Sequence, residues 1–256
     1  MNNNEIINSI RSKNLPVKVS FNNQERLENL AGRIAAQLEV DSLTLLNVMR
    51  DPEFLNTADL NAKTALSMYI PNSYEFFWNS SAEAFRDRMF KEYKRFWNND
   101  RIAKARALKL SKSEVYTIAS IVQKETAKVD ERPRVAGVYL NRIRKGIKLD
   151  ADPTVIYAVK SVKNDWDMEI KRVLYKDLET DSPYNTYRNA GVPPGPIYMP
   201  DISSIDAVLN AEKHDYYYFV ANVERFGYHK FAKTLSQHNA NSAAYRLWIN
   251  QQGIRR

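Results

Sequence analysis

The clearest hydrophobic pattern in the chain lies between residues 111 and 126. Its apolar members recur at intervals of three and four, the spacing of one buried helix face: Val115, Ile118, Ala119 and Val122. Ser111 and Glu114 have the spacing of a capping box, in which each side chain accepts a hydrogen bond from the other residue's backbone N–H. The pattern predicts a helix that begins at Ser111 and ends near Thr126.

One carboxyl group lies on the apolar side of this predicted helix. A turn of about 100° per residue places Glu125 beside Ile118 and Ile121, whereas Gln123 and Lys124 point the other way. A carboxyl group among aliphatic side chains loses hydration, so its pKa should rise and its protonated form becomes available near neutral pH. Glu125 is therefore a candidate general acid.

The pattern also leaves a structural interpretation of Glu125 open. At the end of a helix its side chain can reach water, or it can pair with Arg132 or Arg134. Carboxyl groups with shifted pKa values are often structural, because ion-pair networks shift them too. Periodicity identifies the residue and does not decide between the two interpretations.

The N-terminal residues form a pattern of their own. Residues 16–21 alternate between apolar and polar side chains, as a short strand does. Amphipathic helical patterns follow over residues 24–38 and 42–49. We predict a strand–helix–helix module over residues 1–60 and a second domain over residues 61–256.

Helical patterns dominate the second domain. They cover about residues 81–97, 133–146, 152–159, 203–211 and 241–251. Residues 215–221 and 228–234 predict a β-hairpin, and the stretch at 182–200, rich in proline and tyrosine, predicts an irregular loop that is either a binding surface or a rigid connector. The fold class is therefore α+β, helix-rich with short β-hairpins.

The net charge favours a polyanionic partner. It is +8, with a pI of about 9.4, which suits nucleic acid, an anionic membrane surface or an acidic polymer. Lysine and arginine are scattered among acidic residues with no long basic block, which argues against nucleic acid.

We expect no metal and no cofactor. The sequence has no cysteine, which excludes disulfides, thiolate metal sites and a cysteine nucleophile. Its three histidines, His214, His229 and His238, are irregularly spaced, which argues against a zinc site. No phosphate-binding or dinucleotide-binding fingerprint occurs among its 7 glycines.

No signal peptide and no membrane span are expected. No apolar run approaches the roughly 20 residues that a spanning helix needs, and the first residues lack the features of a signal peptide. The chain as given is expected to be soluble. It opens directly in a pattern that predicts a helix over residues 5–11, so we expect it to be part of a longer protein.

Six motifs, in order, resemble those of the YceG-like family and span about Ser111 to Asn239. They are Ile118–Thr126 (IASIVQKET), Val135–Arg142 (VAGVYLNR), Leu149–Tyr157 (LDADPTVIY), Ser182–Tyr187 (SPYNTY), Gly191–Pro196 (GVPPGP) and the YFVA of the predicted hairpin. The family's characterised members are endolytic murein transglycosylases of the MltG type. The resemblance implies a LysM-like module at 1–60 and a YceG-like catalytic domain at 61–256.

The activity that the resemblance implies is a lyase reaction on peptidoglycan. Such enzymes cut glycan strands internally, at the β-1,4 bond between N-acetylmuramic acid and N-acetylglucosamine, without water, and leave a 1,6-anhydro-muramyl end. The implied partners are peptidoglycan strands and the cell-wall synthesis machinery, with no nucleic acid. The implied location is the outer, extracytoplasmic side of the cytoplasmic membrane, held there by an N-terminal anchor that this chain lacks.

The resemblance places the catalytic residue at Glu125, the second glutamate of the family's Glu-Lys-Glu-Thr type motif. The first acidic position is Gln123 here. This departure is harmless if residue 123 faces away from the cleft, and matters if the first acid helps to position substrate. A single glutamate would act first as acid toward the glycosidic oxygen and then as base toward the muramyl C6 hydroxyl.

Other positions are substrate-binding candidates by family motif. They are Arg142, Asp152, Thr154, Tyr184, Asn185, Thr186, Tyr187 and His229, with the pair His238–Asn239 as a further candidate. Each also has a structural interpretation: Asp152 as a helix cap, Tyr184 or Tyr187 as a loop buttress, and Arg142 as the ion-pair partner of Asp150 or Asp152.

Rival functions remain open at this stage. One is an ordinary glycoside hydrolase in which Glu125 is the acid and Asp152 the second carboxylate. Another is a non-enzymatic binder of glycan or nucleic acid. A pyridoxal-phosphate lyase is set aside, because no lysine lies in a buried, motif-like setting.

Overall fold

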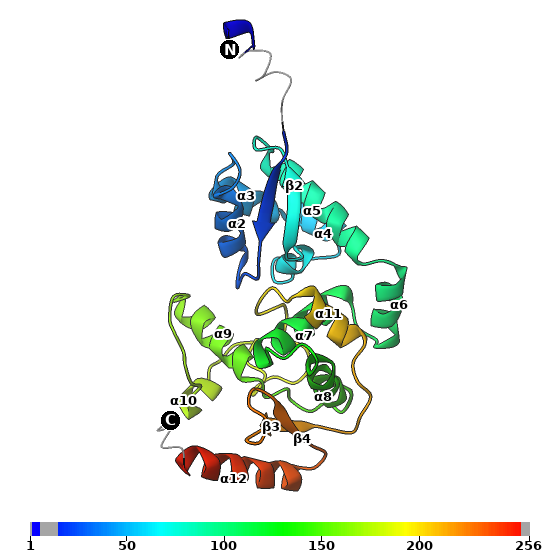
Figure 1. Ribbon diagram of the computed structural model, residues 1–256, viewed down its shortest axis with the longest axis vertical. Coiled ribbons are helices and arrows are strands. Elements are labelled where there is room, and N and C mark those ends of the chain that lie inside the picture. Colours follow the sequence, from blue (N-terminus) through cyan, green and yellow to red (C-terminus); the bar gives the residue numbers. More distant parts are fainter. Residues whose placement is uncertain (1, 6–14, 252–256) are drawn as a thin grey trace. The chain divides into compact units, whose positions relative to one another are not determined.

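The computed structural model describes residues 2–5 and 15–251 (Figure 1). The chain divides into two compact units, Met1–Phe96 and Trp97–Arg256. The helix predicted over residues 5–11 falls almost wholly outside the described residues. The α+β, helix-rich class predicted from the sequence is confirmed: helices predominate and the strands form two short antiparallel pairs.

The N-terminal unit is built around a two-stranded antiparallel sheet. β1 (Val17–Phe21) pairs with β2 (Asn72–Phe76), with Val19 opposite Tyr74. Val19 and Phe21 are buried because alternate side chains of a strand point to the same face. The helices of this unit are α2 (Leu27–Ala35), α3 (Ser42–Met49), α4 (Pro52–Thr57), the short 3₁₀ helix η1 (Ala65–Met68) and α5 (Ala82–Phe96).

The boundary between the units lies at Phe96–Trp97 and not at residue 60. The predicted order of strand, helix and helix is present as β1, α2 and α3, but β2 supplies the second strand of the sheet and α5 packs against α3. Pairing between strands so far apart in the sequence leaves no local pattern, which is why the sequence placed the boundary too early. The likeness of this unit to LysM stays a prediction.

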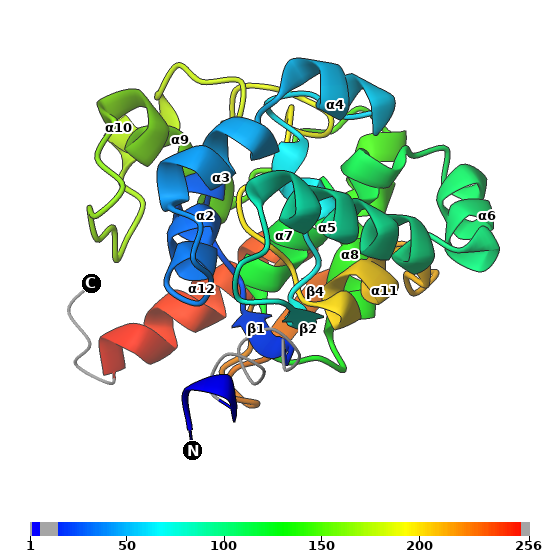
Figure 2. The ribbon, with the colours of Figure 1, turned by 90° about the horizontal axis from the view of Figure 1, so that it is seen from above.

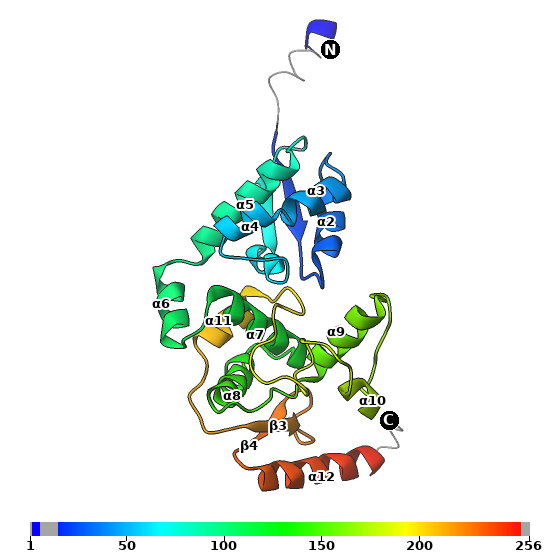
Figure 3. The same cartoon turned by 180° about the vertical axis from the view of Figure 1, so that it is seen from behind.

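The C-terminal unit is organised around α7 (Lys112–Glu125), against which α6, α8, α9 and α11 pack (Figure 3). The predicted capping box is confirmed, with Ser111 and Glu114 bonding each other's backbone N–H. All residues from Val115 to Val122 are buried, so α7 is enclosed on every side. The other elements are α6 (Asn99–Ala107), α8 (Arg132–Arg144), α9 (Asp152–Lys163), α10 (Tyr175–Leu178), α11 (Ile202–Leu209), β3 (Tyr218–Ala221), β4 (His229–Ala232) and α12 (Leu235–Gln251).

The predicted hairpin is present, with β3 antiparallel to β4 and Ala221 opposite His229. α12 packs against both strands and begins at Leu235, earlier than predicted (Figure 1). Figure 2 shows α12 as the red helix that leads to the end of the described chain. Between α10 and α11 the chain is irregular, as its proline content suggested. Within residues 2–5 and 15–251, no helix combines the length and the apolar character that crossing a membrane requires.

Candidate active site

Glu125 is the last residue of α7, and its side chain lines a cleft of about 410 Å³. It follows a stretch of α7 that is buried throughout and that includes Ile118 and Ile121, the residues beside which the sequence periodicity predicts it. The hydroxyl of Tyr139, which projects from α8, donates a hydrogen bond of 2.8 Å to the Glu125 Oε1. The carboxyl group is thus fixed by one donor while it remains accessible from the cleft.

The environment of Glu125 raises its pKa from 4.5 to about 7. Burial is the largest cause, because removal from water disfavours the charged form. The Tyr139 hydrogen bond and the charge of His229 act in the opposite direction, and the negative charge of Asp152 raises the pKa further. Near neutral pH both forms of the Glu125 carboxyl group are therefore populated, which suits a group that first gives and then takes a proton.

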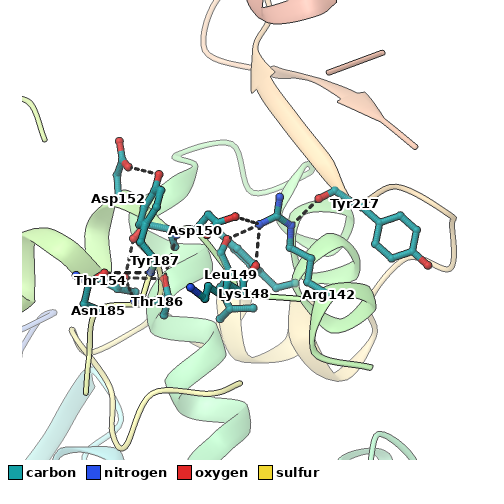
Figure 4. A network of polar contacts seen from close by, with 12 residues as sticks. Arg142, Lys148, Leu149, Asp150, Asp152, Thr154, Asn185, Thr186, Tyr187 and Tyr217 are labelled. Atoms are coloured by element: carbon teal, nitrogen blue, oxygen red, sulfur yellow. Dashed lines mark hydrogen bonds and ion pairs between the residues drawn. The ribbon is translucent and has the colours of Figure 1, made fainter. Parts of the chain in front are cut away.

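Asp152 and Tyr187 form a hydrogen-bonded pair on the wall of the same cleft. The Tyr187 hydroxyl donates to the Asp152 Oδ1 at 2.7 Å (Figure 4). The structural interpretation of Asp152 as the cap of α9 is wrong: Ala151 occupies the N-cap position and Asp152 is the first helical residue. Its exposed carboxylate is consequently directed to Tyr187, and burial together with this bond raises the pKa of Tyr187.

Thr154, Asn185 and Thr186 are buried behind the cleft wall and do not line it. The Thr154 and Thr186 hydroxyls lie 2.8 Å apart, and Thr186 Oγ1 also accepts the Ala151 N–H at 3.0 Å. Asn185 donates from Nδ2 to the carbonyls of Leu178 and Thr180, at 2.9 Å each. Thr154 and Thr186 thus join the irregular loop to the start of α9, and Asn185 joins the same loop to the end of α10. Both connections support the loop that carries Tyr187.

Tyr184 also lies away from the cleft. Its half-buried ring packs on Tyr157, with 4.7 Å between the ring centroids. This is the buttressing arrangement that was one of its two interpretations.

Arg142 borders the cleft and bonds within the protein through its Nε and Nη1. Its Nε donates to the Tyr217 carbonyl at 2.6 Å, and its Nη1 bonds the carbonyls of Lys148 and Leu149 and the Asp150 carboxylate (Figure 4). Asp150 has a φ of +48°, a conformation that non-glycine residues rarely adopt. Arg142 thus stabilises a strained turn at the cleft floor, and the Asp150 ion pair agrees with one of its two predicted roles.

His229, the first residue of β4, lies next to the site without lining the cleft. Its Nδ1 is 2.8 Å from Glu131 Oε2 and its backbone N–H donates to Glu131 Oε1 at 2.7 Å. A carboxylate only accepts, so Nδ1 carries the proton. Glu131 also accepts from Thr126, the residue after Glu125, at 3.1 Å. These bonds outweigh the burial that would raise the pKa of Glu131, and lower it.

Gln123 points away from the cleft, as the helical phase predicted. It bonds the backbone N–H and the carboxylate of Asp201, at 3.1 and 3.0 Å, and accepts from the Ser204 hydroxyl at 2.7 Å. Position 123 therefore joins α7 to α11, and glutamine can both donate and accept there.

Sequence reasoning overlooked several residues of the site. Tyr139 lies within the Val135–Arg142 motif and was not singled out as a site residue, although a buried tyrosine hydroxyl usually needs a partner. The cleft also contains Asp150, Tyr217, Tyr218 and Phe219. His238, named only as half of a motif pair, stacks on Tyr218 at 5.3 Å between ring centroids and lines the cleft.

This arrangement suits acid–base catalysis. The cleft is lined by aromatic side chains, and one of its carboxyl groups, Glu125, has a pKa of about 7. In the described part of the chain, no three histidine, aspartate or glutamate side chains are grouped so that they could hold a metal ion. The chain belongs to the YceG-like family, whose family model matches residues 1–244.

Proteins similar to this chain carry a common name. The endolytic murein transglycosylase of Bacillus subtilis (strain 168) is 43% identical over 137 residues, which are 54% of this chain and 36% of that protein. The protein of the same name from Streptococcus pneumoniae (strain R6) is 30% identical over 198 residues, 75% of this chain and 34% of that protein. The chain therefore spans about a third of the length of these relatives.

A solved structure supports the fold. The crystal structure of a yceG-like protein from Listeria monocytogenes matches with a TM-score of 0.73 and 33% sequence identity, and the match covers 94% of this chain and 81% of that one.

Proposed function

We propose that this chain carries the catalytic domain of an endolytic lytic transglycosylase. It cleaves the β-1,4 bond between N-acetylmuramic acid and N-acetylglucosamine within peptidoglycan strands and leaves 1,6-anhydro-muramyl ends. The observation that carries the proposal is Glu125, a cleft carboxyl group with a pKa of about 7 that is held by Tyr139. Family membership and the names of the relatives support the substrate class.

The reaction needs one residue in two roles. Protonated Glu125 gives its proton to the glycosidic oxygen as the bond from that oxygen to muramyl C1 breaks, which releases the N-acetylglucosamine hydroxyl. The Glu125 carboxylate then takes the proton of the muramyl C6 hydroxyl while O6 forms a bond to C1. Glu125 ends protonated, as it began, and no water is consumed.

The neighbouring groups have supporting roles in this proposal. The Tyr139 hydroxyl orients the Glu125 carboxyl group and stabilises its charged form between the two steps. The Asp152 carboxylate, on the cleft wall, favours the positive charge that develops at C1. Arg142 and the Thr154–Thr186 contact hold the backbone around these groups.

An ordinary hydrolase is the second candidate, because Asp152 places a further carboxylate in the same cleft. Asp152 would then activate water or attack C1. The hydrogen bond from Tyr187 occupies one of its oxygens and makes that oxygen a weaker base or nucleophile, so we favour the transglycosylase.

Product analysis tests the proposal. Purified glycan strands are digested in H₂¹⁸O, and the new ends are examined by mass spectrometry. The transglycosylase gives anhydro ends that are lighter than reducing ends by one water and contain no ¹⁸O. Reducing ends that carry ¹⁸O would establish the hydrolase and refute the proposal.

The location and the protein partners belong to the same proposal. A murein-cleaving domain works where peptidoglycan is, so we place it on the extracytoplasmic side of the membrane. We further propose that it works beside the cell-wall synthesis machinery.

A further inference from the structure

A second cavity, which we call the side pocket, adjoins the catalytic cleft. It has a volume of about 470 Å³ and shares two lining residues with the cleft, Asp152 and Tyr187. The shared residues are the hydrogen-bonded pair of the cleft wall. A ligand that lies over Glu125 and has a branch on this side can therefore reach both spaces without crossing the protein interior.

The lining of the side pocket has an excess of positive charge. Arg172 and Lys176 line it, and in the described part of the chain neither forms an ion pair or a side-chain hydrogen bond. By contrast, Arg101, Arg134 and Arg142 of the same unit are each paired with a carboxylate. One acidic group, Asp152, also faces the pocket; it accepts the Tyr187 hydroxyl and keeps its negative charge, so the two cations outnumber it in the lining.

The remaining wall is apolar and well supported. Leu174 and Leu178 line the pocket, and Tyr175 stands at its edge with 91% of its surface exposed. The segment is held by the Asp177 side chain, which accepts the Leu174 N–H at 2.8 Å, and by Asn185, which binds the Leu178 carbonyl. The two unpaired cations suit a carboxylate, and the apolar residues beside them suit small apolar groups. The pocket therefore fits a short branch that carries small apolar groups and ends in a carboxylate.

We propose that the side pocket binds the acidic branch of the muramyl residue whose sugar ring lies at Glu125, with Arg172 and Lys176 contacting a carboxylate of its stem peptide. The inference rests on the proposed function, since it takes the glycan of peptidoglycan as the ligand of the cleft. It adds a specificity determinant: strands with charged stem peptides bind more tightly than strands whose peptides are neutral.

The test measures binding, so that it does not depend on turnover. The full chain with Glu125→Gln is compared with the same protein carrying Arg172→Gln and Lys176→Gln as well. Three ligands are titrated: strands with free stem-peptide carboxylates, the same strands with those carboxylates amidated, and strands stripped of peptide, which retain only the lactyl carboxylate. Lys145→Gln with Lys163→Gln is the matched control, because both lysines are exposed and neither lines a pocket that adjoins the cleft.

The double substitution should weaken binding of the free-carboxylate strands about fivefold, as expected for two solvent-exposed charge contacts. Binding of the amidated strands should not change, and the control should bind all three ligands as the parent does. A loss confined to stripped strands would overturn the stem-peptide contact, because it would assign the two cations to the lactyl carboxylate.

Two further results would overturn the inference: no loss on any ligand beyond that of the control, or an equal loss on all three, amidated strands included. Failure of the proposed function would look different. It would appear as an absence of anhydro ends in digests by the unsubstituted protein, whatever the three affinities are.

Discussion

Replacing Tyr139 by phenylalanine should make the Glu125 carboxyl group a weaker acid. The substitution keeps the ring and removes the hydroxyl that donates to the Glu125 Oε1 at 2.8 Å. This bond stabilises the charged carboxylate more than the neutral acid, and so lowers the pKa of Glu125. Without it, the pKa should rise above its value of about 7.

The magnitude follows from the energy of such a bond. A hydrogen bond to a charged group contributes about 1.5–3 kcal/mol, and the neutral acid keeps part of it. A difference of about 1.4 kcal/mol between the two protonation states is one pKa unit. We therefore expect the pKa of Glu125 to rise by about one unit, to near 8.

The assay is kcat/KM for anhydro-end release as a function of pH. The first step needs protonated Glu125, so the alkaline limb of the profile should move upward by about one unit in Tyr139→Phe. Tyr74→Phe is the control, because it removes a buried hydroxyl that bonds the Ile70 carbonyl and leaves Glu125 untouched. An unmoved alkaline limb, with a lowered rate at every pH, would refute the electrostatic reasoning and leave Tyr139 a purely steric role.

Three further predictions concern stability. Because the folded pKa of Glu125 is about 7 against 4.5 ordinarily, wild-type stability should fall as pH rises from about 4.5 to 7, by about 3 kcal/mol. In urea unfolding, Glu125→Gln should be more stable than wild type at pH 8 and as stable as wild type at pH 4. If the two proteins were equally stable at both pH values, the pKa of Glu125 would not be raised. Glu131→Gln should lower the free energy of unfolding by about 2 kcal/mol at pH 7, because the variant loses the carboxylate that His229 contacts. Because the pKa of Glu131 is lowered in the folded protein, its carboxylate loses its stabilising contribution as pH falls. The difference in free energy of unfolding between wild type and Glu131→Gln should therefore shrink near pH 3. A difference that stays constant with pH would contradict this reasoning. Arg142→Lys should lower the free energy of unfolding by about 3 kcal/mol, because an ammonium group cannot reproduce the fixed set of bonds that the guanidinium makes. The control Arg144→Lys, at an exposed position, should change it by no more than about 0.5 kcal/mol. Equal losses for the two variants in thermal unfolding would contradict this account.

Local chemistry made part of the site predictable from sequence. The Ser111–Glu114 capping box fixes where α7 begins, and helical phase from there places Glu125 on the buried side and Gln123 on the side of α11. Each of these features depends on residues within one or two helical turns. The hairpin of β3 and β4 was predictable for the same reason, since its strands are neighbours in the sequence.

Long-range contacts were not predictable in this way. β2 joins β1 across most of the N-terminal unit, so the boundary at Phe96 had no local signal. Motif membership could not separate Tyr187, which lines the cleft, from Thr186, which is buried behind it. Adjacent residues of an irregular loop point in different directions according to their tertiary contacts, here the bond between the Thr154 and Thr186 hydroxyls.

The N-cap of α9 shows a smaller limit of the same kind. Asp-Pro is a typical cap followed by the first helical residue, yet the helix begins one residue earlier, at Asp152 itself. The contact between the Ala151 N–H and Thr186 fixes that start. At this position the Asp152 side chain lines the cleft and does not cap the helix.

The most direct test of the account compares the products of three proteins on the same glycan strands: wild type, Glu125→Gln and Asp152→Asn. Mass spectrometry counts the anhydro-muramyl ends released in a fixed time. The account predicts that Glu125→Gln releases none, while Asp152→Asn, which keeps an oxygen to accept the Tyr187 hydroxyl, still releases anhydro ends at a reduced rate. Anhydro ends from Glu125→Gln at the wild-type rate would contradict the claim that this one carboxyl group performs the reaction.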